Sequence, residues 1–143
     1  MIEIGPLRPG GAAWEVLARG YKTFYQESEP DEAYEQTWRR LTAGTELFGL
    51  GARLDGRLVG IAHYVFHPAV WSGEACYLQD LFTDEAARGR GAARALIEGV
   101  AAAARERGAD RLYWHTQEGN TRACVLYDKV ARFTGFIRYA YPL

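Results

Sequence analysis

The sequence predicts an α/β fold in which helices cover both faces of a central, twisted, mixed sheet. Strand-like runs joined by turns dominate the first half of the chain, and strand-like and helix-like runs alternate in the second half. Hairpins pair antiparallel and βαβ units pair parallel, so the two halves together indicate a mixed sheet. The expected order of elements is βααβββαβαβ, with six or seven strands in the sheet.

The first half is predicted to hold one strand, two helices and a hairpin. The strand, 2–7, ends at Pro9-Gly10-Gly11, and the helix after it has Ala13, Leu17, Tyr21 and Phe24 at helical spacing. The second helix begins near 28–31, where Ser28 can cap it, and one face carries Tyr34, Trp38 and Leu41. The hairpin joins runs 47–54 and 57–66 through Asp55-Gly56, a strong two-residue turn signal.

The second half is predicted to alternate strands with helices. A strand at 74–84 precedes an amphipathic helix at 91–107, which Gly108 terminates. A strand at 111–116, a helix at 120–131 and a last strand at 136–141 complete the order.

The composition fits one globular domain over residues 1–143. The net charge of −1 argues against a nucleic-acid partner, which needs a basic face. We expect no signal peptide and no membrane partner, because no apolar run approaches the roughly 20 residues of a membrane helix. Cys76 and Cys124 are far apart, so we expect two free thiols and a cytoplasmic protein, with one disulfide as the alternative.

The segment 81–93 leads from a strand through a loop into a helix. Small residues at Gly89, Gly91, Ala92 and Ala93 would let a ligand approach the backbone of the helix start. Arg88 and Arg90 add charge and bidentate donors. These features predict a pyrophosphate site; the alternative is that the glycines only shape a turn and the arginines are solvated.

Two motifs resemble those of the GNAT acetyltransferase family. Arg88-x-x-Gly91-x-Ala93 resembles the family's acetyl-CoA signature, and Asn120-x-x-Ala123-x-x-Leu126-Tyr127 with Gly135-Phe136 resembles its second segment. The sequences at 77–82 and 127–131 are similar to those of the branch that contains the yeast histone/polyamine acetyltransferases and the diamine acetyltransferases. The resemblance implies an acetyl-CoA-dependent N-acetyltransferase with acetyl-CoA as co-substrate and no metal.

The resemblance also implies which residues bind the cofactor. The backbone of Leu81, Phe82 and Thr83 would pair with the pantetheine arm. The pyrophosphate would lie on the loop and helix start made by Arg88, Gly89, Arg90, Gly91, Ala92, Ala93 and Arg94. Asn120, Ala123 and Tyr127 recur on one helix face, which would run along the pantetheine.

Two residues are the catalytic candidates. Tyr127 would give a proton to the leaving thiolate, since a phenol has a pKa of about 10 and a thiol about 8.5; the alternative is a packed core aromatic. Asp80 is a candidate for binding the amine and a less certain candidate for the general base. Glu74 and Glu118 are weaker candidates for the base.

The predicted acceptor site combines aromatic and polar side chains, namely Tyr21, Tyr25, Trp38, Gln79 and Asp80. Aromatic faces and acids suit a cationic amine, so we expect a polyamine, a diamine or a lysine-type amine; the alternative is that the aromatic residues face the core. His63, His67 and His115 have no metal-ligand spacing, so no metal is expected. A non-catalytic acyl-CoA sensor is the competing function. A homodimer is plausible through the aromatic-rich tail 133–143.

Overall fold

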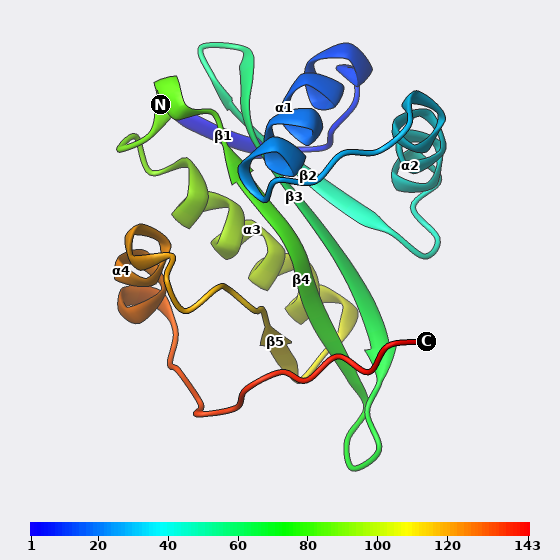
Figure 1. Ribbon diagram of the computed structural model, residues 1–143, viewed down its shortest axis with the longest axis vertical. Helices are drawn as coiled ribbons and strands as arrows, with labels where there is room; N and C mark the ends of the chain where they lie inside the picture. The colour runs from blue at the N-terminus through cyan, green and yellow to red at the C-terminus, as the bar shows by residue number, and fades with distance from the viewer.

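The computed structural model describes residues 1–143 and shows five strands and four α-helices (Figure 1). The strands lie in the sheet in the order of the chain, and the first four are antiparallel, whereas the last is parallel to its neighbour. Their bounds are β1 Ile2–Gly5, β2 Phe48–Leu54, β3 Arg57–Pro68, β4 Glu74–Thr83 and β5 Arg111–Tyr113. The mixed α/β sheet predicted from the sequence is therefore present.

Helices cover both faces of this sheet, as expected. Their bounds are α1 Gly11–Phe24, α2 Asp31–Ala43, α3 Ala92–Arg107 and α4 Thr121–Val130, with a short 3₁₀ turn, η1, at Glu85–Ala87. One apolar core lies between α3 and the sheet and centres on Leu96 and Val100. A second core lies on the opposite face, where Trp14 and Leu17 of α1 pack against Ile61.

The β2–β3 hairpin forms as predicted because its two turn residues take the conformation that the turn requires. Asp55 has φ 51° and Gly56 has φ 80°, so both lie in the left-handed region. Two successive left-handed residues match the twist of the flanking strands. The hairpin places β3 in the middle of the sheet, between β2 and β4.

A β-bulge interrupts the pairing of β3 with β4. His63 pairs with Asp80 and Tyr64 pairs with Leu78, which leaves Gln79 without a partner. The extra residue breaks the simple alternation of side chains. Leu78 belongs to the α3-side core, whereas Asp80, only two residues later, turns to the α1 side and meets His63.

The pairing of β4 with β5 is short. It includes only Ala75 with Arg111, Cys76 with Leu112 and Tyr77 with Tyr113. Beyond Tyr77, β4 continues to Thr83 with no strand on that side. The strand predicted at 111–116 thus ends three residues early. The segment that follows it turns away from β4 and leads to α4 (Figure 1).

The prediction of six or seven strands is wrong, because the sheet has five. The last predicted strand, 136–141, forms no strand and runs as an extended tail to the C-terminus (Figure 1). Its aromatic and β-branched side chains favour a strand, but a strand also needs a neighbour for its backbone hydrogen bonds, and no strand of this chain pairs with it. None of the helices has the length and apolarity to cross a membrane.

Candidate active site

The loop between β4 and α3 forms an open cradle at the start of the helix. Gly89 has φ 82° and Gly91 has φ 83°, a conformation that residues with a Cβ rarely adopt. Gly91 precedes the first turn of α3, and no side chain caps that turn. Its leading N–H groups are therefore free to bind an anion, with the positive end of the helix dipole behind them.

The arginines that flank the cradle differ in whether they form an ion pair within the protein. Arg88 and Arg90 form no ion pair within the protein, so both are free to meet a phosphate. Arg94, also predicted to bind cofactor, forms an ion pair with Glu98 on the outer face of α3, with 3.0 Å between Nε and Oε1. Ala92, the first residue of α3, is buried, and Ala93 is partly buried.

The end of β4 carries an unsatisfied polar group. The Thr83 hydroxyl is buried and has no hydrogen-bond partner in the protein. Buried polar groups nearly always have a partner, so an orphan here points to a missing one. The edge of β4 after Tyr77 is also unpaired. The predicted pantetheine path, Leu81 to Thr83, therefore has the free polar groups that a bound acetyl-CoA needs.

A narrow pocket lies where β4 separates from β5. Eight residues line it: Tyr21, Tyr25, Leu78, Gln79, Leu81, Trp114, His115 and Tyr127. Four of them, Tyr21, Tyr25, Gln79 and Tyr127, were predicted from the sequence as acceptor-binding or catalytic residues. The structure therefore brings α1, β4 and α4 together at the position where the thioester and the amine are expected to meet.

Tyr127 lies in this pocket on α4 and packs edge-on against Trp114, with 5.4 Å between the ring centroids. Burial, followed by the influence of Tyr25 and Cys124, raises the pKa of Tyr127 to about 12. The phenol therefore keeps its proton at neutral pH and can act as a hydrogen-bond donor. Full proton transfer to a thiolate is less favourable than a free phenol would allow.

Asn120 is the N-cap of α4, and its Oδ1 accepts a hydrogen bond from the Ala123 N–H at 3.4 Å. The resemblance implied that Asn120 lies along the pantetheine, and the structure shows that its side chain also caps the helix, a role that is compatible with such a contact. The Asn120 side chain also lies near the phenol of Tyr25, at the end of α1.

Asp80 lies beside this pocket on the α1 side of the sheet. Its Oδ2 lies 2.9 Å from Nδ1 of His63. Burial opposes ionisation, but the interactions with His63, Tyr21 and Lys22 outweigh it, so the pKa of the Asp80 carboxyl lies below its usual value. Burial and the negative charge of Asp80 in turn raise the pKa of Tyr21.

His63 and Trp14 are site residues that the sequence analysis missed. The Trp14 indole N–H donates to Nε2 of His63 at 2.9 Å, and His63 continues the chain to Asp80. Trp14 and His63 are 49 positions apart, so no local motif joins them. Only the alternating direction of side chains along a strand indicates from the sequence that His63 faces the same side as Ile61.

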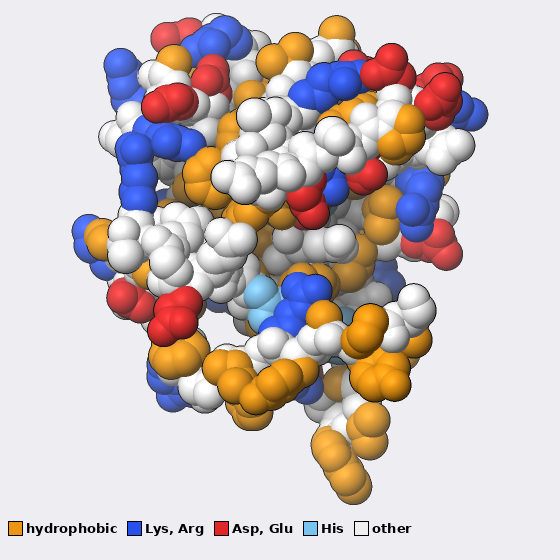
Figure 2. Space-filling view, in the orientation of Figure 1, with side chains coloured by type: hydrophobic (Ala, Val, Ile, Leu, Met, Phe, Trp, Pro, Cys, Tyr) orange, Lys and Arg blue, Asp and Glu red, His pale blue; other side chains and the backbone are white.

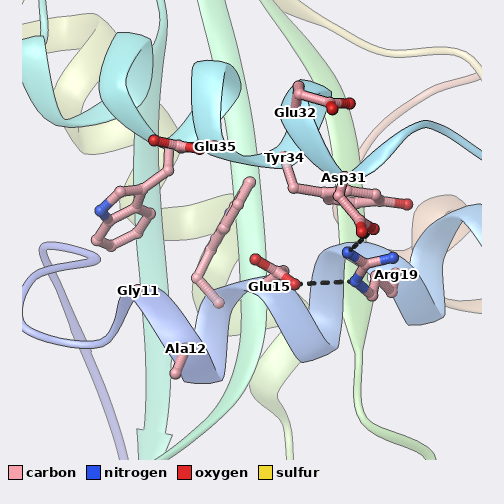
Figure 3. Close-up of a pocket in the computed structure, with 10 residues that line it drawn as sticks. Gly11, Ala12, Glu15, Arg19, Asp31, Glu32, Tyr34 and Glu35 are labelled. Carbon is pink, nitrogen blue, oxygen red and sulfur yellow. Dashed lines mark hydrogen bonds and ion pairs between the residues drawn. The ribbon is translucent and has the colours of Figure 1, made fainter.

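Trp38 lies apart from the other predicted acceptor residues. It packs on Trp14, with 5.4 Å between ring centroids, in a wider hollow of about 530 Å³ between α1 and α2. Figure 3 shows this hollow, in which Arg19 of α1 bridges Glu15 and Asp31 while Glu32 and Glu35 border it from α2. Trp38 does not line the narrow pocket between β4 and β5.

Comparison with known proteins gives the family. The model of the acetyltransferase (GNAT) family matches residues 14–133. The chain therefore belongs to the GNAT family and is an acetyl-CoA-dependent N-acetyltransferase, as the two sequence motifs implied. The family assignment favours an enzyme over a non-catalytic acyl-CoA sensor.

A sequence relative supports this assignment, and solved structures share the fold. The chain is 37% identical over 131 residues to the D-amino-acid N-acetyltransferase HPA3 of Saccharomyces cerevisiae, covering 89% of this chain and 81% of that protein. The aminoglycoside acetyltransferase AAC(6')-Iy, solved with a bisubstrate analog, has a TM-score of 0.88 at 18% identity, over 100% of this chain and 99% of its own. A ribosomal-protein-alanine N-acetyltransferase from Brucella melitensis biovar Abortus 2308 has a TM-score of 0.77 at 26% identity, over 100% and 98%.

Proposed function

We propose that this enzyme transfers the acetyl group of acetyl-CoA directly to a small primary amine within a ternary complex. The observation that carries the proposal is the meeting of two groups of opposite function at one pocket. Tyr127, a protonated phenol, lines the pocket from α4, and the anionic Asp80 lies beside Tyr21 at its other wall. A donor for the leaving group and an anion for the amine are what the reaction needs.

The residues around the α3 start fit acetyl-CoA, which supplies the activated acetyl group as a thioester. Arg88, Arg90 and the uncapped N–H groups after Gly91 would hold the pyrophosphate. The β4 edge from Leu81 to the orphan Thr83 hydroxyl would hold the pantetheine, with Ala123 of α4 on its other side. Tyr127 would donate a hydrogen bond to the sulfur as the thioester carbon–sulfur bond breaks.

Asp80 is proposed to bind the amine as an ammonium ion. A carboxylate with a lowered pKa is a weak base, so Asp80 suits charge pairing better than direct removal of the proton. The ammonium must still lose a proton before it attacks, since an alkylamine has a pKa of about 10. Water in the pocket beside Gln79 is the proposed route for that proton.

Direct transfer is favoured over a covalent enzyme intermediate. Cys76 is buried, and burial raises its pKa to about 11, so it is not a thiolate at neutral pH. His63 bonds to Trp14 and Asp80, His67 bonds to Pro68 and Tyr113, and His115 bonds to Tyr77. None of the three histidines activates a cysteine. A Cys–His nucleophile is therefore missing.

The proposed acceptors are polyamines, diamines and lysine-type amines, because an anion and aromatic rings together suit an alkylammonium ion. Tyr21 and Tyr25 pack against each other beside Asp80, with 5.0 Å between ring centroids. The activities of the relatives, on D-amino acids and on an aminoglycoside, broaden the range of amines to be tested.

The experiment measures thiol release from acetyl-CoA against a panel that includes a polyamine, a diamine, lysine, several D-amino acids and an aminoglycoside. Release that depends on the amine, with intersecting initial-rate lines, supports the proposal. Mass spectrometry after incubation with acetyl-CoA alone should show no acetylated protein. A stable acetyl-enzyme, or parallel initial-rate lines, would overturn direct transfer.

A homodimer and a cytoplasmic location complete the proposal. Large apolar side chains of the tail are exposed, including Phe136 at 85% and Tyr139 at 86%, and Figure 2 shows apolar side chains gathered at this end of the molecule. A second copy of the chain would cover them. The two free cysteines support a reducing compartment.

A further inference from the structure

A chain of hydrogen bonds runs from the buried α1 side into the active site. Trp14 is 1% exposed and donates its indole N–H to Nε2 of His63 at 2.9 Å. Nδ1 of His63 lies 2.9 Å from Oδ2 of Asp80. The three side chains come from α1, β3 and β4, so the chain joins three separate elements.

The chemistry of these groups determines the direction of every bond. An indole nitrogen can only donate, so Nε2 of His63 must accept and carries no proton. Nδ1 then carries the ring proton and donates to Asp80, which accepts as a carboxylate. Of the two neutral tautomers of His63, only the one with its proton on Nδ1 makes both bonds.

The backbone presents His63 and Asp80 to each other. The two residues are direct cross-strand partners in the β3–β4 ladder. The bulge at Gln79 turns Asp80 to the α1 side, where His63 lies, and leaves Leu78 on the other face. Without the bulge, Asp80 would point with Leu78 toward the α3-side core. The strand pairing therefore brings Asp80 to the face on which its side chain meets His63.

We propose that Trp14 and His63 are positioning residues that hold the Asp80 carboxylate, in one orientation, for the amine acceptor. The role in acceptor binding rests on the proposed function, whereas the hydrogen-bond relay itself does not. Neither residue touches the acceptor. Trp14 selects the tautomer of His63, and His63 orients Asp80, which leaves the other carboxylate oxygen for the incoming ammonium.

The first test observes the relay in the protein without substrates. Long-range ¹H–¹⁵N NMR distinguishes protonated from unprotonated ring nitrogens, and the chain has only three histidines. We expect His63 to show a proton on Nδ1 and none on Nε2. In Trp14→Phe, we expect this single tautomer to be replaced by a mixture, because Nε2 has lost its donor.

The matched control for this variant is Trp38→Phe. Trp38 packs on Trp14 but makes no hydrogen bond to His63, so the control removes a similar amount of aromatic surface from the same cluster. The His63 tautomer should be unchanged in Trp38→Phe. His67, which bonds to Pro68 and Tyr113 instead, serves as an internal reference in every spectrum.

The second test separates positioning from simple stability by two substitutions of His63. Asn places an N–H near the Nδ1 position and can still donate to Asp80, whereas Gln reaches toward the Nε2 position. We expect His63→Gln to raise the KM for the amine about tenfold and His63→Asn to raise it about threefold or less, as expected for losing or keeping a bond to a charged group. The KM for acetyl-CoA should stay within about twofold in both variants.

Three outcomes would overturn the proposal. The first is a His63 signal with its proton on Nε2, or one that Trp14→Phe leaves unchanged. The second is equal KM values for the amine in the Gln and Asn variants. The third is that the His63 variants differ from the wild type only in a lower melting temperature or in a higher KM for acetyl-CoA. If the wild type acetylates no amine, the proposed function fails, while the NMR experiment still tests the relay.

Discussion

Tyr127 packs edge-on against Trp114, with 5.4 Å between their ring centroids, and this contact places the phenol of α4 in the pocket where β4 and β5 separate. An edge-to-face pair holds a ring in a defined orientation. The hydroxyl of Tyr127 is therefore aimed by packing, not by a hydrogen bond from a neighbouring side chain. Its chemical role can be tested separately from its packing.

Tyr127→Phe keeps the ring against Trp114 and removes only the hydroxyl. We expect kcat to fall by about 10²- to 10³-fold, the effect of losing one positioned hydrogen-bond donor, with little change in the KM for acetyl-CoA. The pKa of about 12 keeps the phenol protonated from pH 6 to 9, so Tyr127 should add no alkaline limb to the rate profile there. An unchanged kcat in Tyr127→Phe would exclude this role.

Arg88→Ala should weaken binding of coenzyme A about tenfold by calorimetry, because a charge-assisted contact to phosphate is lost. Binding by the wild type should also fall more steeply with added salt than binding by the variant. Arg105→Ala is the control, since Arg105 lies in the last turn of the same helix, α3. Equal losses in both variants would show that the overall charge matters and the cradle does not.

Gly91→Ala tests the left-handed residue that opens α3. No atom lies within 4 Å of an added Cβ, so the cost comes from the φ of 83° and not from a clash. We expect a loss of about 1–2 kcal/mol in the free energy of unfolding and weaker coenzyme A binding. Gly73→Ala, which also meets nothing and has no positive φ, should change stability by less than about 0.5 kcal/mol. Equal effects of the two substitutions would contradict the prediction.

The parts of the fold predicted well are those with local causes. The β2–β3 hairpin follows from the two residues Asp55 and Gly56, and α3 follows from its amphipathic period and the terminating Gly108, which has φ 88°. The pyrophosphate cradle is also a local strand–loop–helix segment. Patterns of this kind are contained in a few neighbouring residues.

The parts that were missed depend on partners distant in the sequence. Trp14 and His63 meet because α1 packs on β3, and the bulge at Gln79 appears only when β3 and β4 pair. The tail 136–141 has the composition of a strand, yet no strand within the chain pairs with it. Its conformation therefore depends on what lies beside it and not on its own sequence.

The pH dependence of stability tests the state of Asp80. Its pKa is lower in the folded protein than the usual value of 3.8, so the ionised form favours folding above that value. This contribution should be lost as the pH falls below about 4. In urea titrations from pH 7 to 3, we expect the wild type to lose stability relative to Asp80→Asn only at the acid end. A difference that is constant, or that moves the opposite way, would contradict the lowered pKa.

The exposed tail provides the last prediction. Phe136, Ile137, Tyr139 and Tyr141 are 74–87% exposed in the isolated chain, and so much apolar surface in one segment is typical of an interface. We expect the wild type to sediment as a dimer, and a variant lacking residues 134–143 to sediment as a monomer that still binds coenzyme A. Val16→Ser removes another exposed apolar residue, from α1, and should leave the dimer intact. A wild type that remains monomeric at every concentration would show that the tail does not bind a second copy of the chain. A truncated protein that remains a dimer would show that the interface lies elsewhere.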